Sequence, residues 1–158
     1  MCTVALLETP DGGYVLGHNR DESRARGRAA PPTERVASGR RFLAPTDADA
    51  GGTWISVNDA GVTVCVLNAA ELDPVRLPAE PESRGRLALD LARCVDPADA
   101  RAAIERSIDR LRRVRAFHLV VVARDDDGRG VRATWIGWDG RELRAEQARE
   151  TAQSLRRD

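Results

Sequence analysis

The sequence predicts a layered α+β fold in one domain. Apolar runs typical of β-strands fill the first half, amphipathic helical patterns follow, and further strand-like runs occupy residues 117–123 and 133–138. With 158 residues and 42% hydrophobic content, the chain can bury one core. We expect a single domain over residues 1–140 and a polar tail with weak helical character over residues 141–158.

Four strands are expected in the first half of the chain. Residues 3–8 and 14–18 are apolar runs joined by a Pro-Asp-Gly-Gly turn, which predicts a hairpin. Residues 53–57 and 62–68 form a second pair around an Asn-Asp-Ala-Gly turn. Residues 19–49 have almost no periodicity and are rich in Arg, Ala, Pro and Gly, so we expect a long functional or mobile loop there.

Two helices are expected after a Pro-rich linker over residues 72–82. Ser83 can cap a helix that runs to about Cys94. Asp96-Pro97 suits the cap and first turn of a second helix that runs to about Val114. Each predicted helix has one apolar face, which suits a layer packed on the strands.

The charge pattern excludes several classes of partner and mechanism. The chain has 25 basic and 25 acidic side chains, so no net field recruits nucleic acid or a membrane surface. All 25 basic residues are Arg, which excludes a lysine base or a Schiff base. The apolar run at residues 4–7 is too short for a signal peptide or a membrane span.

Cysteine and histidine usage indicates a reducing compartment and no metal site. Cys2, Cys65 and Cys94 are odd in number and widely spaced, and only His18 and His118 could join them around a metal. We therefore expect a cytoplasmic protein with no metal and no other cofactor. Cys65 and Cys94 lie on apolar patterns and are expected in the core.

Cys2 is the residue with the clearest chemistry. Aminopeptidases remove an initial Met when the next side chain is small, which leaves cysteine as the first residue. An α-amine ordinarily titrates near pH ~8, so part of it is an unprotonated base at neutral pH and can take the proton of the thiol. No separate histidine base is then required. The alternative is a vestigial cysteine, because many proteins carry one at this position by chance.

The first predicted hairpin brings other polar residues toward Cys2. The segment Gly17-His18-Asn19-Arg20-Asp21-Glu22 lies at the end of the strand beside the first one. Asp21 can orient the terminal ammonium or the thiol, and Arg20 or His18 can favour a thiolate. Asn68 ends the fourth predicted strand, where its side-chain amide can donate to a developing oxyanion.

Four short motifs follow one another in order along the chain. They are Met1-Cys2, Asn19-Arg20-Asp21-Glu22, Ala50-Gly51-Gly52-Thr53-Trp54 and Asn58…Asn68. In this ordered set the chain resembles the NRDE family, also called the transport and Golgi organisation protein family, and the resemblance covers residues 1–68 well and 83–138 loosely. More distantly, the chain is similar to the choloylglycine-hydrolase and acid-ceramidase group of N-terminal-nucleophile (Ntn) hydrolases.

The resemblance to the Ntn hydrolases implies both a fold and a site. The fold is an αββα layered sandwich, which a chain this short can leave incomplete. By position, Cys2 would be the nucleophile and base, Asp21 its orienter and Asn68 an oxyanion donor. Arg20 is a further candidate catalytic residue, and the candidate substrate-binding residues are His18, Asn19 and Trp54.

Two departures from the hydrolase pattern leave alternatives open. Those enzymes carry Arg three residues before the Asp, where this chain has His18, and their C-terminal half normally supplies another Asn and Arg. The chain is a short member, an inactive remnant, or a protein that completes its site with a partner. Arg20 and Asp21 can instead form an ion pair that holds the loop, Asn68 can be a turn residue, and His18 and Trp54 can be structural.

Two functions from different classes are predicted. The first is an Ntn-type amidohydrolase-like protein that cleaves a linear amide bond through a thioester on Cys2. The second is a non-catalytic family member that handles a lipid or haem ligand, with a Golgi organisation and secretion role in the eukaryotic branch. The expected partner is a small-molecule amide or lipid-like ligand, and a homo-oligomer is compatible with this sequence. The Arg-rich loop is either a solvated surface or attracts an anionic head group.

Overall fold

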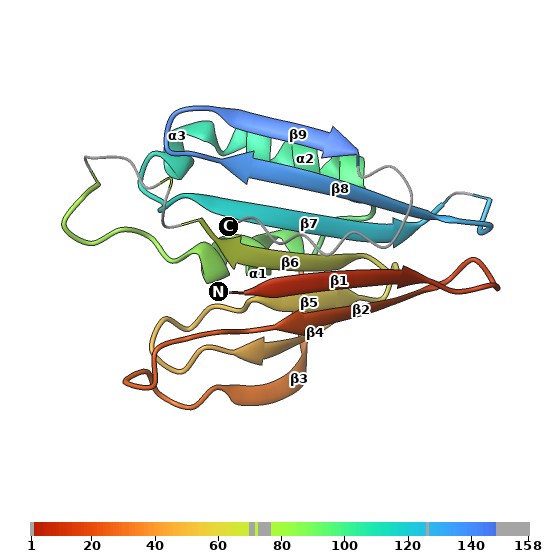
Figure 1. The fold of residues 1–158 in the computed structure, drawn as a ribbon, viewed down its shortest axis with the longest axis horizontal. Coiled ribbons are helices and arrows are strands. Elements are labelled where there is room, and N and C mark those ends of the chain that lie inside the picture. Colours follow the sequence, from red (N-terminus) through yellow and green to blue (C-terminus); the bar gives the residue numbers. More distant parts are fainter. Residues whose placement is uncertain (1, 70–71, 73–76, 126, 148–158) are drawn as a thin grey trace.

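The computed structural model describes residues 2–69, 72, 77–125 and 127–147 and arranges them in three layers. A seven-stranded antiparallel sheet forms the middle layer. Helices cover one of its faces, and a two-stranded hairpin covers the other (Figure 1). The expected α+β layered sandwich is confirmed.

The hairpin consists of β1 (Thr3–Glu8) and β2 (Tyr14–Asn19), close to the predicted bounds. Its inward residues pack on the large sheet in a cluster that includes Val4, which is buried. The hydroxyl of Tyr14 donates to the carbonyl oxygen of Gly61 at 2.8 Å. The hairpin is therefore attached to the sheet beneath it by both apolar packing and hydrogen bonding.

The strands of the large sheet follow one another in sequence order, each antiparallel to the next. The strands expected at residues 53–57, 62–68, 117–123 and 133–138 are confirmed as four of them. The full set is β3 (Ala30–Ala37), β4 (Arg40–Thr46), β5 (Ile55–Asn58), β6 (Thr63–Asn68), β7 (Phe117–Arg124), β8 (Val131–Trp138) and β9 (Leu143–Gln147).

The long loop expected over residues 19–49 is wrong in part, because β3 and β4 form a hairpin inside it. Ser38 and Gly39, both with positive φ, make the turn. β3 is an edge strand with mostly exposed residues, so it lacks the apolar–polar alternation of a half-buried strand. Pro31 and Pro32 fall where the register with β4 shifts, and a sheet edge tolerates proline.

The helical character expected after Arg141 is also wrong, because β9 pairs with β8 along its whole length. β9 is the second edge strand of the sheet, and Arg144 and Glu146 on its outer side are exposed. A short polar segment of this kind suits an exposed helix or an edge strand equally well, and only the pairing decides. Residues 148–158 of the expected tail lie outside the described residues.

The helices begin at the predicted caps. α1 (Arg84–Leu91) starts after Ser83, whose hydroxyl oxygen accepts a hydrogen bond from a backbone N–H of the first turn at 3.2 Å. α2 (Pro97–Arg106) starts after Asp96, whose carboxylate accepts a backbone N–H at 2.7 Å. These local signals act within a few residues, which explains why the sequence shows them.

The second helix was expected to run unbroken to Val114, but it is divided. α2 ends before Ser107, and α3 (Ile108–Leu111) follows it. The hydroxyl of Ser107 donates to the carbonyl oxygen of Ala103 at 2.9 Å, a side-chain bond that often bends helices. In the part of the chain that the structure describes, no helix is long and apolar enough to span a membrane.

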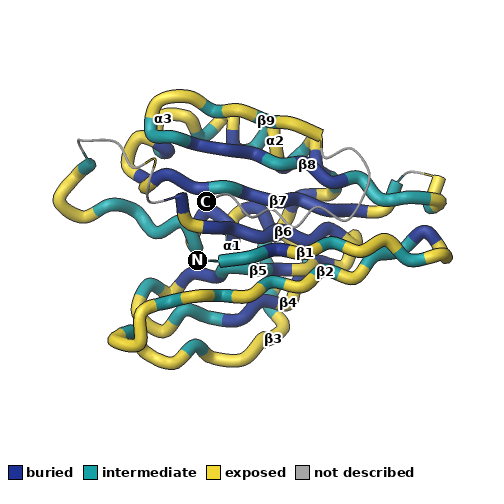
Figure 2. The backbone as a smooth tube through the Cα atoms, in the orientation of Figure 1, coloured by how far each residue is buried: buried dark blue, intermediate teal, exposed yellow. Residues whose placement is uncertain are grey.

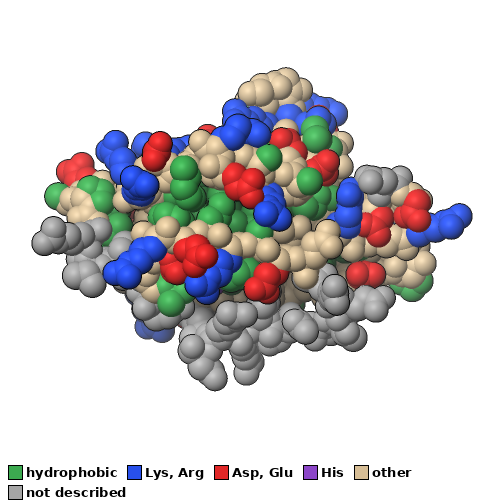
Figure 3. Space-filling model, turned by 90° about the horizontal axis from the view of Figure 1, so that it is seen from above, with side chains coloured by type: hydrophobic (Ala, Val, Ile, Leu, Met, Phe, Trp, Pro, Cys, Tyr) green, Lys and Arg blue, Asp and Glu red, His purple; other side chains and the backbone are tan. Residues whose placement is uncertain are grey.

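Separate apolar cores lie on the two faces of the large sheet (Figure 2). The larger core joins the helices to the sheet around Leu87, Ile104 and Ile136. On the outer face of the hairpin, Leu7 and Val15 lie opposite each other and are 61% and 60% exposed. Among the described residues, one helical layer and two sheet layers of the expected αββα sandwich are therefore present. The face seen from the β9 edge mixes acidic and basic side chains (Figure 3).

Candidate active site

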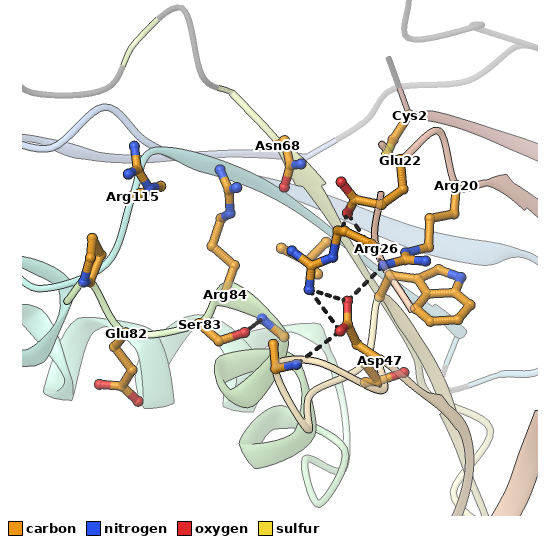
Figure 4. Close-up of a pocket in the computed structure, with 16 residues that line it drawn as sticks. Cys2, Arg20, Glu22, Arg26, Asp47, Asn68, Glu82, Ser83, Arg84 and Arg115 are labelled. Atoms are coloured by element: carbon orange, nitrogen blue, oxygen red, sulfur yellow. Dashed lines mark hydrogen bonds and ion pairs between the residues drawn. The ribbon is translucent and has the colours of Figure 1, made fainter. Parts of the chain in front are cut away.

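A cavity of about 310 Å³ lies beside the end of β6, the segment after β4 and the first turn of α1 (Figure 4). Of the residues predicted from the sequence, Cys2, Arg20, Trp54 and Asn68 line it. They come from segments that are distant along the chain and meet only because the hairpin packs on the large sheet. The structure therefore gathers four of the seven candidates around one space.

Strand pairing places Cys2 beside Asp21. Cys2 immediately precedes β1, and Thr3 lies opposite Asn19 at the end of β2. The chain that leaves β2 therefore passes Cys2. The thiol of Cys2 donates a hydrogen bond to the backbone carbonyl oxygen of Asp21, with a sulfur–oxygen distance of 3.7 Å. A thiol is a weak donor, so this contact orients the sulfur more than it stabilises the fold.

The carboxyl group of Asp21 is associated with the N-terminus of the chain. A hydrogen bond with the terminal ammonium, which in this chain belongs to Met1, lowers the pKa of this carboxyl group below its ordinary value of 3.8. Asp21 is consequently ionised at neutral pH. An ionised carboxylate at this place favours a positive charge at the start of the chain.

The other two thiols are protonated core residues. Burial raises the pKa of Cys65 to about 12 and that of Cys94 to about 11. Both residues are at most 1% exposed, whereas Cys2 is half-buried and faces the cavity. The thiolate is the reactive form of cysteine, so Cys2 is the thiol that a ligand in the cavity can reach and use.

Asn68 is held at the cavity by the pairing of its strand. It is the last residue of β6 and lies opposite Phe117, the first residue of β7. The neighbouring Leu67 is buried, and alternation along the strand turns Asn68 to the other side, where it is exposed. Its amide lines the same cavity as Cys2 and can donate to an oxygen there (Figure 4).

Arg20 belongs to a network of ion pairs around Asp47. Its guanidinium group donates to the Asp47 carboxylate at 2.6 Å and to Glu22 at 3.3 Å. Arg26 binds the two oxygens of the same carboxylate at 2.7 and 2.9 Å. Arg20 also lies over the ring of Trp54, 4.6 Å from its centre. These contacts hold the segment that follows β2 against the cavity.

Asp47 is the centre of this network because its oxygens are almost fully used. Besides the two arginines, it accepts backbone N–H groups of Asp49 and Ala50 at 3.0 and 2.9 Å. Burial by itself raises the pKa of the Asp47 carboxyl group, but the hydrogen bonds from Ala50 and Arg26 outweigh burial and lower it. Asp47 is therefore an ionised anchor, and its side chain is only 15% exposed.

His18 and Asn19 are not among the residues that line the cavity. His18 shares the inward face of β2 with Tyr14 and Leu16, and burial lowers its pKa to about 4, with a smaller opposite contribution from the Trp54 backbone. Neither ring nitrogen has a well-formed hydrogen bond within the described residues. A neutral imidazole supplies no positive charge to a thiolate, so this placement fits the structural alternative. Asn19 points to the exposed face.

Two glycines let the segment after β4 approach α1 closely. A side chain on Gly52 would place its Cβ 2.5 Å from the carbonyl carbon of Gly85, and the backbone N–H of Thr53 donates to the Gly85 carbonyl oxygen at 3.1 Å. The backbones of the two segments therefore approach each other closely at Gly52 and Gly85. This approach brings Trp54 and the start of α1 to the same cavity.

Comparison with known proteins identifies the family. The profile of the family described as Transport and Golgi organisation 2 matches residues 1–145. The chain belongs to this family. None of the curated proteins compared with it matches.

A solved structure shares the fold of this chain. It is the crystal structure of the mutant C2A conjugated bile acid hydrolase from Clostridium perfringens, with a TM-score of 0.53 and 16% sequence identity. The match covers 94% of this chain and 51% of that enzyme, so the chain spans about half the length of the hydrolase. The Ntn-hydrolase fold implied by the sequence is confirmed.

Several residues that line the cavity were not predicted from the sequence. Asp47 precedes a turn that contains two glycines, and an Asp at such a position commonly accepts backbone N–H groups, which is a usable signal. Arg84 and Arg115 follow no motif and are recognised only through the fold. Among the described residues, no cluster of His, Cys, Asp and Glu is suited to a metal ion.

Proposed function

We propose that the protein is an Ntn hydrolase that cleaves a linear amide bond through a thioester on Cys2. The observation that carries the proposal is that Cys2 and Asn68 line one cavity. The backbone carbonyl oxygen of Asp21 accepts a hydrogen bond from the Cys2 thiol. The hydrolase of similar fold is a C2A mutant, so that enzyme, like this chain, has a cysteine at position 2.

The reaction needs only the two functional groups of an N-terminal cysteine. After removal of Met1, the α-amine of Cys2 takes the proton of the thiol, and the sulfur attacks the amide carbonyl carbon. The ammonium then returns that proton to the leaving nitrogen as the carbon–nitrogen bond breaks, which releases an amine and leaves a thioester. Water then attacks the thioester carbonyl while the amine takes a proton from it. The carbon–sulfur bond breaks, the ammonium returns that proton to the sulfur, and a carboxylic acid leaves.

Two neighbouring residues assist both stages. The amide of Asn68 donates to the oxygen that becomes negative in each attack, and a single such donor is worth on the order of 10²–10³ in rate. Asp21, whose backbone carbonyl accepts from the Cys2 thiol, has an ionised carboxylate that would stabilise the Cys2 ammonium once Met1 is removed. Arg20 acts indirectly, because Asp47 and Trp54 fix it beside the cavity. The free cysteines suit the reducing cytoplasm in which we place the protein.

The test is intact-mass analysis after exposure to p-nitrophenyl hexanoate, an activated ester that acylates nucleophilic thiols. We expect a hexanoyl adduct on the processed wild-type chain and release of p-nitrophenolate with turnover. Cys2→Ala should abolish both, and Cys2→Ser should turn over much more slowly, because an alcohol is harder to deprotonate than a thiol. Cys94→Ala is the matched control, since it removes a buried thiol and should keep the adduct.

Circular dichroism on every variant separates lost chemistry from lost structure. An adduct that persists in folded Cys2→Ala, or a processed wild-type chain that never becomes acylated, would contradict the hydrolase. The second of these results would favour the alternative in which the family member binds a ligand without turnover.

A further inference from the structure

The position of the Cys2 thiol depends on the segment of chain that leaves β2. The sulfur donates to the backbone carbonyl oxygen of Asp21 at 3.7 Å. Asp21 lies two residues after the end of β2, and residues 20–29 belong to neither a helix nor a strand. Strand pairing therefore does not fix this segment, and its place depends on other contacts.

The residues on either side of Asp21 belong to the ion-pair network around Asp47. Arg20 donates to the Asp47 carboxylate at 2.6 Å. The Glu22 carboxylate lies 3.3 Å from the guanidinium group of Arg20 and 3.7 Å from that of Arg26. Arg26 in turn binds Asp47 at 2.7 Å, so both neighbours of Asp21 are connected to one carboxylate (Figure 4). The network thus holds the backbone that carries the acceptor of the thiol.

Asp47 directly follows β4 and is fixed at the end of that strand. Its backbone N–H donates to the Gly52 carbonyl oxygen at 2.8 Å, and its own carbonyl oxygen accepts from Gly51 at 2.9 Å. Its carboxylate also accepts the backbone N–H of Ala50 at 2.9 Å. The side chain is mostly buried, and partly buried ion pairs are screened less than exposed ones. Asp47 therefore connects the large sheet to the segment beside Cys2.

We propose that Asp47 is a positioning residue for Cys2. Through its two arginines it holds residues 20–22 where the Asp21 carbonyl oxygen receives the thiol, which directs the sulfur to the cavity that Asn68 also lines. The importance of this role for catalysis rests on the proposed hydrolase. The orientation of the thiol does not depend on turnover, so it can be measured separately.

The orientation is measured by NMR of protein labelled with ¹³C at the β-carbons of its cysteines. The buried Cys65 and Cys94 serve as internal controls, and Cys2→Ala identifies the Cys2 signal by removing it. In Asp47→Asn the chemical shift and the Hα–Hβ couplings of Cys2 should report averaging between side-chain rotamers. The other two signals should stay in place, whereas a general loosening of the fold would move all three.

The consequence for catalysis is measured with p-nitrophenyl hexanoate on the processed chain, from the initial burst of p-nitrophenolate. Asp47→Asn should lower the maximal rate of acylation by about 10- to 100-fold, because a nucleophile with several orientations is less often in line with the ester carbonyl. The ester concentration at half-maximal rate should stay within about twofold. Arg20→Gln should have the same effect. The double variant should lose no more than the more affected single variant, because both substitutions break one connection.

Two variants control for lost charge and lost stability. Asp59→Asn changes a carboxylate that binds Arg40 at 2.8 Å and does not line the cavity. Ile104→Val removes a methyl group from the core between the helices and the large sheet, which lowers stability at another place. Both controls should keep the wild-type acylation rate and Cys2 signal, and the melting temperature of every variant is recorded.

Arg20→Gln leaves the bonds from Arg26 and the backbone to Asp47 in place, so the test survives a poorly folded Asp47→Asn. An unchanged Cys2 signal or an undiminished acylation rate in the folded variants would overturn the positioning role. Movement of all three cysteine signals together, additive losses in the double variant, or equal losses in the controls would also overturn it. A selective change at Cys2 in a chain that the ester never acylates would overturn only the hydrolase.

Discussion

The thiol of Cys2 and the backbone carbonyl of Asp21 are joined by a hydrogen bond of 3.7 Å across 19 residues of chain. The register of the hairpin produces this contact, because Thr3 lies opposite Asn19. The carboxyl group of Asp21 also interacts with the terminal ammonium, which in this chain belongs to Met1. Asp21 thus contacts the Cys2 thiol through its backbone and has its carboxylate beside the start of the chain.

The first prediction concerns the N-terminus. We expect the purified chain to begin at Cys2, because cysteine is small enough for removal of Met1 and the proposed chemistry requires a free α-amine. Intact-mass spectrometry and Edman sequencing measure this directly. Retention or acetylation of Met1 in most molecules would be incompatible with the proposed mechanism.

The second prediction concerns the oxyanion donor. Asn68→Ala should lower kcat on the order of 10²–10³ with little change in melting temperature, because the side chain is exposed and its proposed partner is the transition state. Asn19→Ala is the matched control, an exposed Asn at the end of a neighbouring strand that does not line the cavity. Hydrolysis of p-nitrophenyl hexanoate provides the rates, and equal losses in the two variants would remove the assigned role.

The third prediction concerns Asp47. Asp47→Asn should destabilise the fold by about 2–3 kcal/mol, because it leaves hydrogen bonds from two arginines without their charged acceptor. Urea unfolding measures the change. Asp59→Asn is the control, because it also removes the negative charge from an acceptor of an arginine, Arg40. It should lower the free energy of unfolding by less, because that pair is more exposed. A smaller effect at Asp47 than at Asp59 would contradict its role as an anchor.

The stability difference between wild type and Asp47→Asn should depend on pH in a defined direction. The pKa of the Asp47 carboxyl group is lowered from its ordinary value of 3.8, so ionised Asp47 stabilises the folded state. That contribution is complete well above pH 3.8 and is lost as the pH falls through the lowered pKa of the folded state. The stability difference between wild type and Asp47→Asn should therefore shrink as unfolding is repeated below about pH 4. A difference that grows toward acid pH would show that the sign is wrong.

The fourth prediction concerns the contact between the segment after β4 and α1. Gly52→Ala should destabilise the protein by about 1–3 kcal/mol and impair activity, because its Cβ would overlap the backbone of Gly85. Gly17→Ala is the control, since a Cβ there meets nothing within 4 Å. Thermal unfolding of the two variants should separate them clearly, and a neutral Gly52→Ala would mean that the backbone moves apart at little cost.

The sequence alone determined the features that depend on neighbours along the chain. The caps at Ser83 and Asp96 lie within a few residues of the N–H groups that they accept, so their residue types predict where α1 and α2 begin. The strands that bury one or both faces carry alternating or continuous apolar residues, so the sequence predicts them. The chemistry proposed for Cys2 also rests on its position in the chain, because only a cysteine that becomes the first residue has a free α-amine beside its thiol.

Only the tertiary structure decided the edges of the large sheet and the composition of the cavity. β3 and β9 bury little apolar surface, so pairing with a neighbouring strand defines them and their own residue pattern does not. The partners Arg20 and Asp47 are 27 residues apart, and Arg84 is 32 residues from Ala116. Partners so far apart in the sequence leave no local pattern in it. Their interaction energy depends on their distance in space, which is set only when the chain folds.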